Sequence, residues 1–284
     1  MPLEHYACAN CGHWQIWFSG QQPLSCPICT DTRNALPEDG WDFKTEAWAE
    51  ATFTNTWREY APGLWGFSAS PKFGLGATGW LMVREDGNVL FESCPWYKPD
   101  ALAKIRELGG VRVLAASHPH GYGALWQIQR EFDPIVTIHK ADIPYSKAFK
   151  VNWPADDIHE IAPGLTLYHV GGHYEGHSVL HDATNRRLFV GDSLKIEQDS
   201  AGRSTAISCH KAYHYEIPLS HGELARYVEV FRTLPFDTAL TPFEYAPDVG
   251  REVAVELFLQ QMRAQPHTAP VRLEVLRARQ EAAE

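Results

Sequence analysis

The sequence has 284 residues, with 25 Lys and Arg against 35 Asp and Glu, a formal net charge of −10 and 44% hydrophobic residues. This balance argues against a nucleic-acid-binding surface, and the hydrophobic content is enough for a sizeable core. No apolar stretch approaches the roughly 18 residues that cross a bilayer, and the first residues lack the pattern of a secretory signal. We therefore expect a cytoplasmic protein that binds neither nucleic acid nor membrane.

Four of the six cysteines form two close pairs near the N-terminus. The pairs are Cys8 with Cys11 and Cys26 with Cys29, each of the form C-x-x-C, and 14 residues separate them. Two such knuckles can place four thiolates tetrahedrally around one ion. A reducing compartment makes metal ligation a better interpretation than disulfides. We predict a zinc-ribbon or rubredoxin-like module over residues 1–50.

The ion of this module is structural in our interpretation. The two knuckles resemble those of a rubredoxin, whose ion is iron, and both zinc and iron accept tetrahedral thiolates. We favour Zn²⁺, with Fe as the alternative. About 50 residues bury too little apolar surface for a good core, so the ion should supply folding energy. Residues 30–50 are predicted to be a linker to a larger domain over residues 51–284.

Strands and helices alternate after about residue 57. A hairpin is predicted over residues 80–92, because the Asp-Gly pair in its centre supports the positive φ of a tight turn. A helix is predicted over residues 99–108, where a proline starts the pattern and two glycines stop it. A short strand over residues 111–116 follows.

Two later helices and several strands complete the predicted elements. Ser220 and Glu223 form a capping box, and the apolar residues that follow keep helical spacing. Another helix is predicted over residues 251–263. Alternation of strands and helices indicates layered sheets with helices outside. The remaining predicted strands cover residues 135–139, 165–170, 178–182, 188–191 and 238–241.

Histidines and one aspartate stand where predicted strands end. His118 and His120 lie two positions apart after one strand, and His173 and Asp192 each follow another. Two histidines at this spacing on an irregular loop can face one ion. A third histidine and a carboxylate would complete a set of N and O ligands and leave a position for water. Loops at strand ends are where such sites are usually built.

The order of these motifs resembles the metallo-β-lactamase-fold superfamily, over roughly residues 57–245. The His-x-His-x-Asp-His motif of that family corresponds to HPHGYG at 118–123. The Gly-His-Thr-Pro-Gly-His-Ser motif corresponds to GHYEGHS at 172–178, and the strand that ends in Gly-Asp corresponds to FVGDS at 189–193. The resemblance implies an α+β fold, a four-layer αββα sandwich, preceded here by the small cysteine module.

The resemblance also implies one complete metal site. In the family, the first ion takes the two histidines of the first motif and the histidine of the second, which correspond to His118, His120 and His173. The bridging carboxylate corresponds to Asp192. One Zn²⁺ or Fe²⁺ is therefore expected in this site, with Asp192 as a fourth ligand or as the group that orients and deprotonates a water.

The second metal site of the family is dismantled in this sequence. Tyr122 and Gly123 stand where the family has its Asp and His, and Phe243 stands near the place of a late histidine. None of these residues can replace the family's ligands in kind. The sequence is also similar to a subgroup in which a four-cysteine ribbon precedes a His-Pro-His motif without the Asp-His.

Other residues near the motifs are candidates for substrate contact. With no second ion, Tyr122 is a candidate donor to charge that develops on the substrate. Cys94 and Cys209 are expected to be small buried side chains and not nucleophiles. The lower-ranked substrate-binding candidates are His177, Lys195, His210 and His214.

Three functions are compatible with these motifs. The first is a metal-dependent hydrolase in which a single ion activates water against a small ester, thioester, lactone or amide. The second is a mononuclear non-haem iron oxygenase of the same fold, because His and Asp ligands suit Fe(II). The third is a protein without catalysis that binds a metal, a metabolite or a partner. The expected partner is a small-molecule substrate, and the sequence is also compatible with a homo-oligomer.

Overall fold

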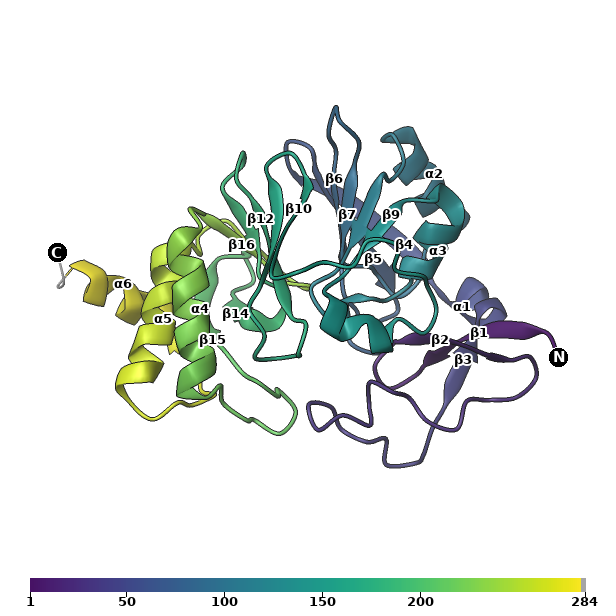
Figure 1. Cartoon of the computed structure of the whole chain (residues 1–284), viewed down its shortest axis with the longest axis horizontal. Coiled ribbons are helices and arrows are strands. Elements are labelled where there is room, and N and C mark those ends of the chain that lie inside the picture. The colour runs from purple at the N-terminus through teal and green to yellow at the C-terminus, as the bar shows by residue number, and fades with distance from the viewer. Residues whose placement is uncertain (282–284) are drawn as a thin grey trace. The chain divides into compact units, whose positions relative to one another are not determined.

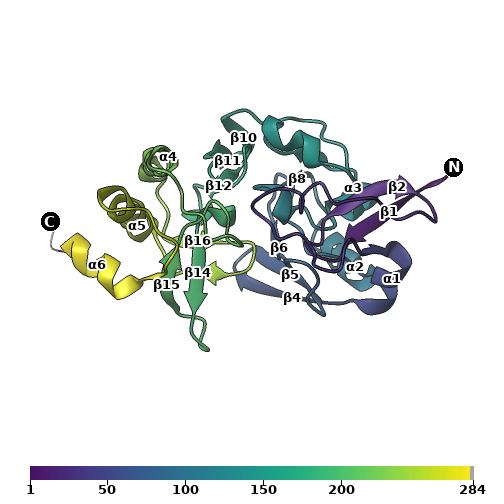
Figure 2. The ribbon, with the colours of Figure 1, turned by 90° about the horizontal axis from the view of Figure 1, so that it is seen from below.

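The computed structural model describes residues 1–281, and the chain divides into two compact units, Met1–Ala155 and Asp156–Glu284. Figure 1 shows the ribbon coloured along the chain, and Figure 2 shows it turned by a quarter turn. In the described residues no helix is both long and apolar enough to span a membrane.

Unit 1 begins with a small antiparallel sheet that carries the cysteines. Its order is β2-β1-β3, with β1 at Leu3–Cys8, β2 at Trp14–Phe18 and β3 at Phe43–Thr45. The helix α1 (Glu46–Thr52) follows directly, and the Thr45 side chain caps it by accepting the Trp48 N–H. The expectation of a linker over residues 30–50 is therefore wrong for its last part, because β3 pairs with β1 and α1 is capped.

The cysteine sheet packs against the rest of unit 1. The Trp14 ring lies 5.5 Å from that of Trp96 and 5.4 Å from that of Trp126, and its indole N–H donates to the Pro95 carbonyl at 3.0 Å. His5 stacks on Trp126 at 3.8 Å. Aromatic contacts of this kind bury large apolar areas, so the cysteine module shares a core with the strands and helices that follow it. A domain boundary near residue 50 stays a prediction.

The main sheet of unit 1 has six strands in the order β4-β5-β6-β7-β8-β9, antiparallel from β4 to β7 and parallel from β7 to β9. The helices α2 and α3 lie beside it (Figure 1) and bury apolar side chains in the same core. The strands are β4 (Thr54–Ala61), β5 (Leu64–Ser70), β6 (Gly79–Met82), β7 (Val89–Phe91), β8 (Val113–Ala115) and β9 (Ile135–Thr137). The helices are α2 (Pro99–Glu107), η1 (Pro119–Gly121), α3 (Leu125–Phe132) and η2 (Lys140–Tyr145).

The predicted elements of this unit are confirmed. The hairpin turns at Gly87, whose φ is +111°. The helix α2 starts at Pro99 and its end is followed by Gly109 and Gly110, both at positive φ. The Asn88 amide donates to the carbonyls of Leu108 and Gly110 and so ties the hairpin to the end of α2.

Over its described residues, 156–281, unit 2 contains a six-stranded sheet, a three-stranded sheet and three α-helices. The larger sheet has the order β10-β11-β12-β13-β16-β17, and the smaller one has the order β14-β15-β18. The strands are β10 (Ile158–Ala162), β11 (Leu165–His169), β12 (Ser178–Asp182), β13 (Arg187–Phe189), β14 (Lys195–Gln198), β15 (Ser204–Ser208), β16 (Thr238–Leu240), β17 (Tyr245–Ala246) and β18 (Val271–Arg272). The helices are η3 (Gly191–Ser193), α4 (His221–Thr233), α5 (Arg251–Arg263) and α6 (Leu273–Glu281).

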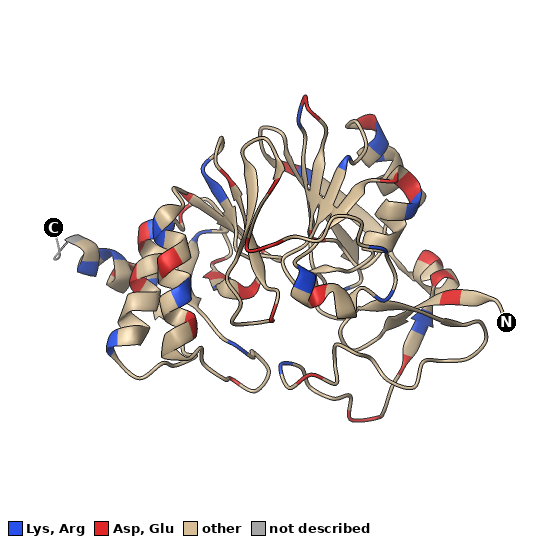
Figure 3. Ribbon diagram, viewed as in Figure 1, with Lys and Arg blue, Asp and Glu red and all other residues tan. Residues whose placement is uncertain are grey.

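The helices α4 and α5 cover the core of unit 2. The predicted capping box is present: the Ser220 side chain accepts the Glu223 N–H, and the Glu223 carboxylate accepts the Ser220 N–H. From α4, Leu224 and Phe231 pack into one apolar cluster with Phe258 of α5 and residues of β12, β13 and β16. The outer faces of the helices carry both signs of charge (Figure 3), in exposed pairs such as Arg226–Glu229 and Arg251–Glu252.

Candidate metal centres

The four predicted cysteine ligands come together at the end of the small sheet. Their ligand atoms all lie within 4.8 Å of one another, and the side chains are at most 7% exposed. The Sγ atoms of Cys8 and Cys29 are 3.7 Å apart, and those of Cys11 and Cys26 are 3.6 Å apart. Two sulfurs at about 2.3 Å from a tetrahedral zinc ion are about 3.8 Å apart. The spacing therefore fits a tetrahedral thiolate site.

Backbone hydrogen bonds form the first knuckle. The Gly12 N–H donates to the Cys8 carbonyl at 2.8 Å, and the Cys8 N–H donates to the His13 carbonyl at 2.9 Å. Gly12 has φ +82°, a conformation that favours glycine. In the second knuckle the Thr30 N–H donates to the Cys26 carbonyl at 3.1 Å. These tight turns bring the thiols of each pair to one side of the knuckle.

His118 is held through a chain of hydrogen bonds to a buried carboxylate. Its Nδ1 lies 2.6 Å from the Ser117 hydroxyl, and that hydroxyl donates to Glu92 Oε1. Because the single hydroxyl proton goes to the carboxylate, the hydroxyl accepts the ring Nδ1–H. This tautomer leaves the Nε2 lone pair of His118 for a metal ion. Gly121 makes room for Glu92, since a Cβ there would lie 1.4 Å from Glu92 Oε2.

His120 is in the same unit, with its ring centroid 5.1 Å from that of His118. Its Nε2 lies 2.8 Å from the side-chain amide of Asn34. Sequence reasoning missed Asn34, which lies 86 positions away in the loop after the second cysteine knuckle.

Unit 2 carries the other two predicted ligands, His173 and Asp192, side by side. The Nδ1 of His173 lies 2.7 Å from the Lys211 carbonyl oxygen, and because a carbonyl only accepts, Nδ1 carries the proton. The Nε2 of His173 lies 3.4 Å from Asp192 Oδ2, and both residues are buried. A cation or a proton between a nitrogen lone pair and a carboxylate oxygen at this distance would offset their repulsion. Two ligand atoms about 2.05 Å from a tetrahedral ion are about 3.4 Å apart.

The backbone of Asp192 is fixed by two residues. The His177 Nε2 accepts the Asp192 N–H at 3.2 Å, which gives this candidate a supporting role. Tyr213, which sequence reasoning missed, donates its hydroxyl to the Asp192 carbonyl at 2.5 Å and stacks on the His173 ring at 5.3 Å. Burial, and then the charge of Asp192, raises the pKa of Tyr213 well above its usual value, so this hydroxyl keeps its proton.

The other three substrate-binding candidates lie in different surroundings. Lys195 and His214 are exposed. The His210 Nε2 lies 2.7 Å from the Thr268 carbonyl oxygen, and burial lowers the pKa of His210. Their roles toward a substrate stay predictions.

The three residues at the positions of the family's second ion lie in different surroundings. Tyr122 is buried, with its ring 5.2 Å from that of Phe149 and its hydroxyl 3.5 Å from the Asp142 carbonyl oxygen. Gly123 has φ +38°, and a Cβ there would lie 2.3 Å from the Ser93 carbonyl oxygen. Phe243 is 43% exposed.

The two remaining cysteines are buried thiols, as expected. Burial raises the pKa of Cys94 and that of Cys209 to about 12. A thiol with so high a pKa is almost never a thiolate near neutral pH, so neither residue has the character of a nucleophile.

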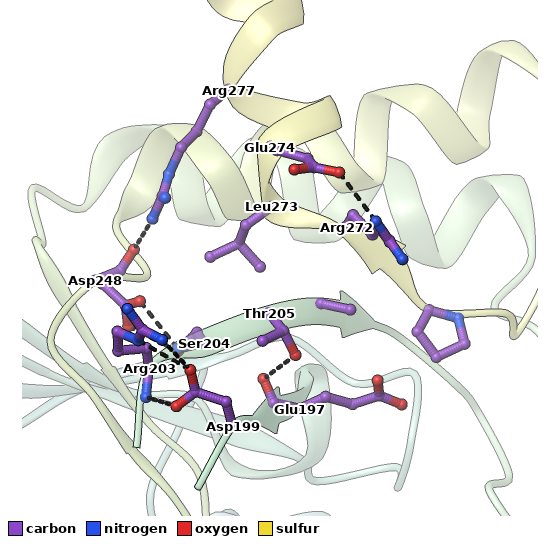
Figure 4. Close-up of a pocket in the computed structure, with 12 residues that line it drawn as sticks. Glu197, Asp199, Arg203, Ser204, Thr205, Asp248, Arg272, Leu273, Glu274 and Arg277 are labelled. Carbon is purple, nitrogen blue, oxygen red and sulfur yellow. Dashed lines mark hydrogen bonds and ion pairs between the residues drawn. The ribbon is translucent and has the colours of Figure 1, made fainter. Parts of the chain in front are cut away.

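A separate hollow of about 730 Å³ lies in unit 2, over β14, β15, β18 and α6. Figure 4 shows that most of its charged side chains lie in pairs at the edges of the hollow. It is lined by residues other than the predicted ligands. Two of its charged interactions are local, one in the turn between β14 and β15 and one at the start of α6, and a third joins α6 to the segment after β17. They join Asp199 with Arg203, Arg272 with Glu274, and Arg277 with the Asp248 carbonyl oxygen.

Comparison with known families decides the assignment of the fold. A sequence model of the metallo-beta-lactamase superfamily matches residues 74–230, more than half of the chain. The chain belongs to the metallo-beta-lactamase superfamily. The predicted fold class is thereby confirmed, with a small N-terminal antiparallel sheet that bears the four cysteines.

Individual relatives are more distant. The uncharacterized protein YmaE of Bacillus subtilis (strain 168) is 27% identical over 256 residues, which cover 85% of this chain and 89% of YmaE. The mono-zinc form of the metallo-beta-lactamase FIM-1 from Pseudomonas aeruginosa aligns with a TM-score of 0.54 and 14% identity, over 75% of this chain and 96% of that one. The metallo-beta-lactamase from Pontibacter korlensis aligns with the same TM-score and identity, over 73% and 100%. At these identities the solved structures show the fold alone.

Proposed function

We propose that this protein is a metal-dependent hydrolase with one ion in a site formed by His118, His120, His173 and Asp192. The observation that carries the proposal is the facing pair in unit 2, where Nε2 of His173 lies 3.4 Å from Asp192 Oδ2 and Nδ1 faces the Lys211 carbonyl oxygen. The two histidines of unit 1 supply matching nitrogen donors. Three neutral imidazoles and one carboxylate form the kind of ligand set that zinc or iron takes in catalytic sites.

Two features of the family support the joining of these pairs into one site. The match to the superfamily spans both pairs of ligands. The solved FIM-1 structure aligns with 75% of the chain. Because unit 1 holds only 155 of the 284 residues, the aligned region includes residues of both units. The FIM-1 structure is a mono-zinc form, so a protein of this fold can hold a single zinc ion.

In this proposal individual residues have separate roles in hydrolysis. His118, His120 and His173 would hold the ion, which when bound would supply hydroxide near neutral pH by lowering the pKa of water to about 7. Asp192, fixed through its backbone by His177 and Tyr213, is placed to accept a proton. We assign to the Tyr122 hydroxyl the stabilisation of charge on the attacked carbonyl. A Tyr122→Phe enzyme should then turn over about 10-fold more slowly, with unchanged metal content; equal turnover removes Tyr122 from the mechanism.

Metal content and oxygen consumption test the proposal. Protein purified without chelators should contain two ions per chain, and His118→Ala or Asp192→Ala should contain one, held by the cysteines. A panel of activated esters, thioesters, lactones and amides should show turnover that chelation abolishes. Wild-type protein with one ion, or with no metal-dependent turnover, would contradict the hydrolase. Oxygen consumption by the Fe²⁺-loaded protein, lost on replacement with Zn²⁺, would instead support an oxygenase.

A further inference from the structure

Asn34 connects the cysteine module to a proposed metal ligand within unit 1. Its side-chain amide lies 2.8 Å from Nε2 of His120, a normal hydrogen-bond distance. The contact joins residues 86 positions apart. A histidine that binds a metal through one ring nitrogen usually donates from the other to an oxygen acceptor, which fixes the orientation of the ring.

The loop that carries Asn34 is attached to both cysteine knuckles. The Asn34 amide also lies 3.3 Å from the Ile28 carbonyl oxygen, and Ile28 stands between Cys26 and Cys29 and is fully buried. Asn10, between Cys8 and Cys11, places its amide 2.9 Å from the carbonyl oxygen of Ala35 and 3.3 Å from the Cys29 sulfur. The position of Asn34 therefore depends on the thiolate site.

The other two histidines of the proposed site have partners of the same kind. His118 donates from Nδ1 to the hydroxyl of Ser117, and His173 donates from Nδ1 to the Lys211 carbonyl. Both thereby present Nε2. His120 is contacted at Nε2, so the nitrogen that it presents to a metal is Nδ1. In this structure the Asn34 NH2 group faces both Nε2 of His120 and the Ile28 carbonyl oxygen. Turned by half a rotation, the amide places Oδ1 on the ring side, where it accepts the Nε2–H. The contact with Ile28 is then given up, and Asn10 keeps the loop attached to the knuckles through the Ala35 carbonyl oxygen.

We propose that Asn34 is a positioning residue: it holds Nε2 of His120 from the cysteine module and so directs Nδ1 of His120 to the catalytic metal ion. This inference rests on the proposed function, since it requires an ion at the histidines. It assigns the N-terminal module a role in the hydrolase site, because the structural ion fixes the loop, the loop fixes Asn34, and Asn34 fixes a ligand.

Metal affinity tests this role without any assay of activity. In Asn34→Leu, which keeps the side-chain size and removes the hydrogen bond, the ion at the histidines should bind 10–100-fold more weakly in a chelator competition. Asn34→Asp keeps an oxygen acceptor and should recover affinity to within a few-fold of wild type. Thr32→Ala, at an exposed position of the same loop, is the matched control and should bind as wild type.

Two spectroscopic readouts separate positioning from damage to the module. The thiolate-to-cobalt absorption of the Co²⁺-loaded cysteine site should be the same in wild type and in Asn34→Leu. Nitrogen NMR of the Zn²⁺-loaded wild type should show His120 metal-bound at Nδ1 and protonated at Nε2. Unchanged affinity in Asn34→Leu, failure of Asn34→Asp to recover affinity, or metal at Nε2 of His120 would each overturn the inference. Wild type without a second ion would instead overturn the proposed function.

Discussion

The two proposed metal centres of this protein are built in opposite ways. The four cysteines lie within 22 residues of chain, on two knuckles closed by local backbone hydrogen bonds. The proposed catalytic ligands are spread from His118 to Asp192 and stand after strands of two different sheets. In the first centre an ion would organise a segment that is too small to fold well alone. In the second, the fold must form first, and a hydrogen-bonded partner of each histidine orients it toward the ion.

Removal of a cysteine ligand should have the largest effect. Cys26→Ser should lose the structural ion, destabilise the small sheet and release Asn34, so both ions should be lost or weakened. We expect the Tm to fall by roughly 10 °C, because a structural metal supplies folding free energy. Elemental analysis and thermal unfolding measure this. If Cys26→Ser keeps both the Tm and the second ion, the cysteine ion neither stabilises the small sheet nor supports the histidine site.

Removal of the carboxylate of the catalytic centre should affect chemistry more than folding. Asp192→Asn should lower turnover by about 10²–10⁴-fold, because it removes a ligand and a proton acceptor. The Tm of the metal-free protein should stay close to that of the parent. Glu197→Gln, an acid-to-amide change at an exposed position, is the control for both measurements. A large fall in the Tm of Asp192→Asn would assign this residue a structural role.

Loss of the partner of His118 should have an intermediate effect. Ser117→Ala removes the hydroxyl between the His118 ring and Glu92, so the ring loses the acceptor that fixes its tautomer. We expect the second ion to bind about 10–100-fold more weakly, with the cysteine ion unchanged. Chelator competition measures the affinity, and the exposed Ser200→Ala serves as a control. Equal affinities in the two variants would show that His118 needs no such partner.

The smallest expected effect concerns the reactivity of the cysteine thiols and not the activity of the protein. Hydrogen bonds from neighbouring thiols, first that of Cys11, lower the pKa of Cys8 and of Cys29, whereas burial raises that of Cys94 to about 12. After metal removal at pH 8, alkylation mapped by mass spectrometry should label Cys8 and Cys29 before Cys94.

The raised pKa of Cys94 also predicts how the stability of the protein depends on pH. The folded state holds the Cys94 proton more tightly than the unfolded chain, whose thiol has the ordinary pKa of about 9. The contribution of Cys94 is therefore fully present below pH 9 and is lost as the pH rises toward 12. Unfolding measured from pH 8 to pH 10 should show a smaller decline in Cys94→Ala than in wild type.

Local patterns in the sequence predicted much of the fold. The C-x-x-C spacing predicted the thiolate cluster, and the capping box at Ser220 predicted the start of α4. These signals depend on neighbours within a few residues, so they survive without any knowledge of the tertiary structure. By contrast, α3 lacks a side-chain hydrogen bond at its N-cap, Ala124, and spans only eight residues, and it was not predicted.

Residues that act across long distances in sequence could not be predicted in the same way. Asn34 stands in a polar loop that looks like any linker, and nothing near it indicates a contact with His120. Tyr213 stands between His210 and His214, which are the metal-ligand type of residue, yet it is Tyr213 that binds the Asp192 carbonyl. Both contacts depend on where the fold places loops, and the resemblance to a known family carries no information about residues outside the family's motifs.

The backbone at Gly123 limits how this loop could be redesigned. A histidine there would need a left-handed conformation, and its Cβ would lie 2.3 Å from the Ser93 carbonyl oxygen and 2.6 Å from the Cys94 carbonyl oxygen. Substituting histidine for Gly123 therefore cannot by itself provide a ligand for a second ion, because the segment at residues 93–94 would have to retreat at the same time. An engineer who wants a two-ion protein would have to rebuild that segment together with the glycine it touches.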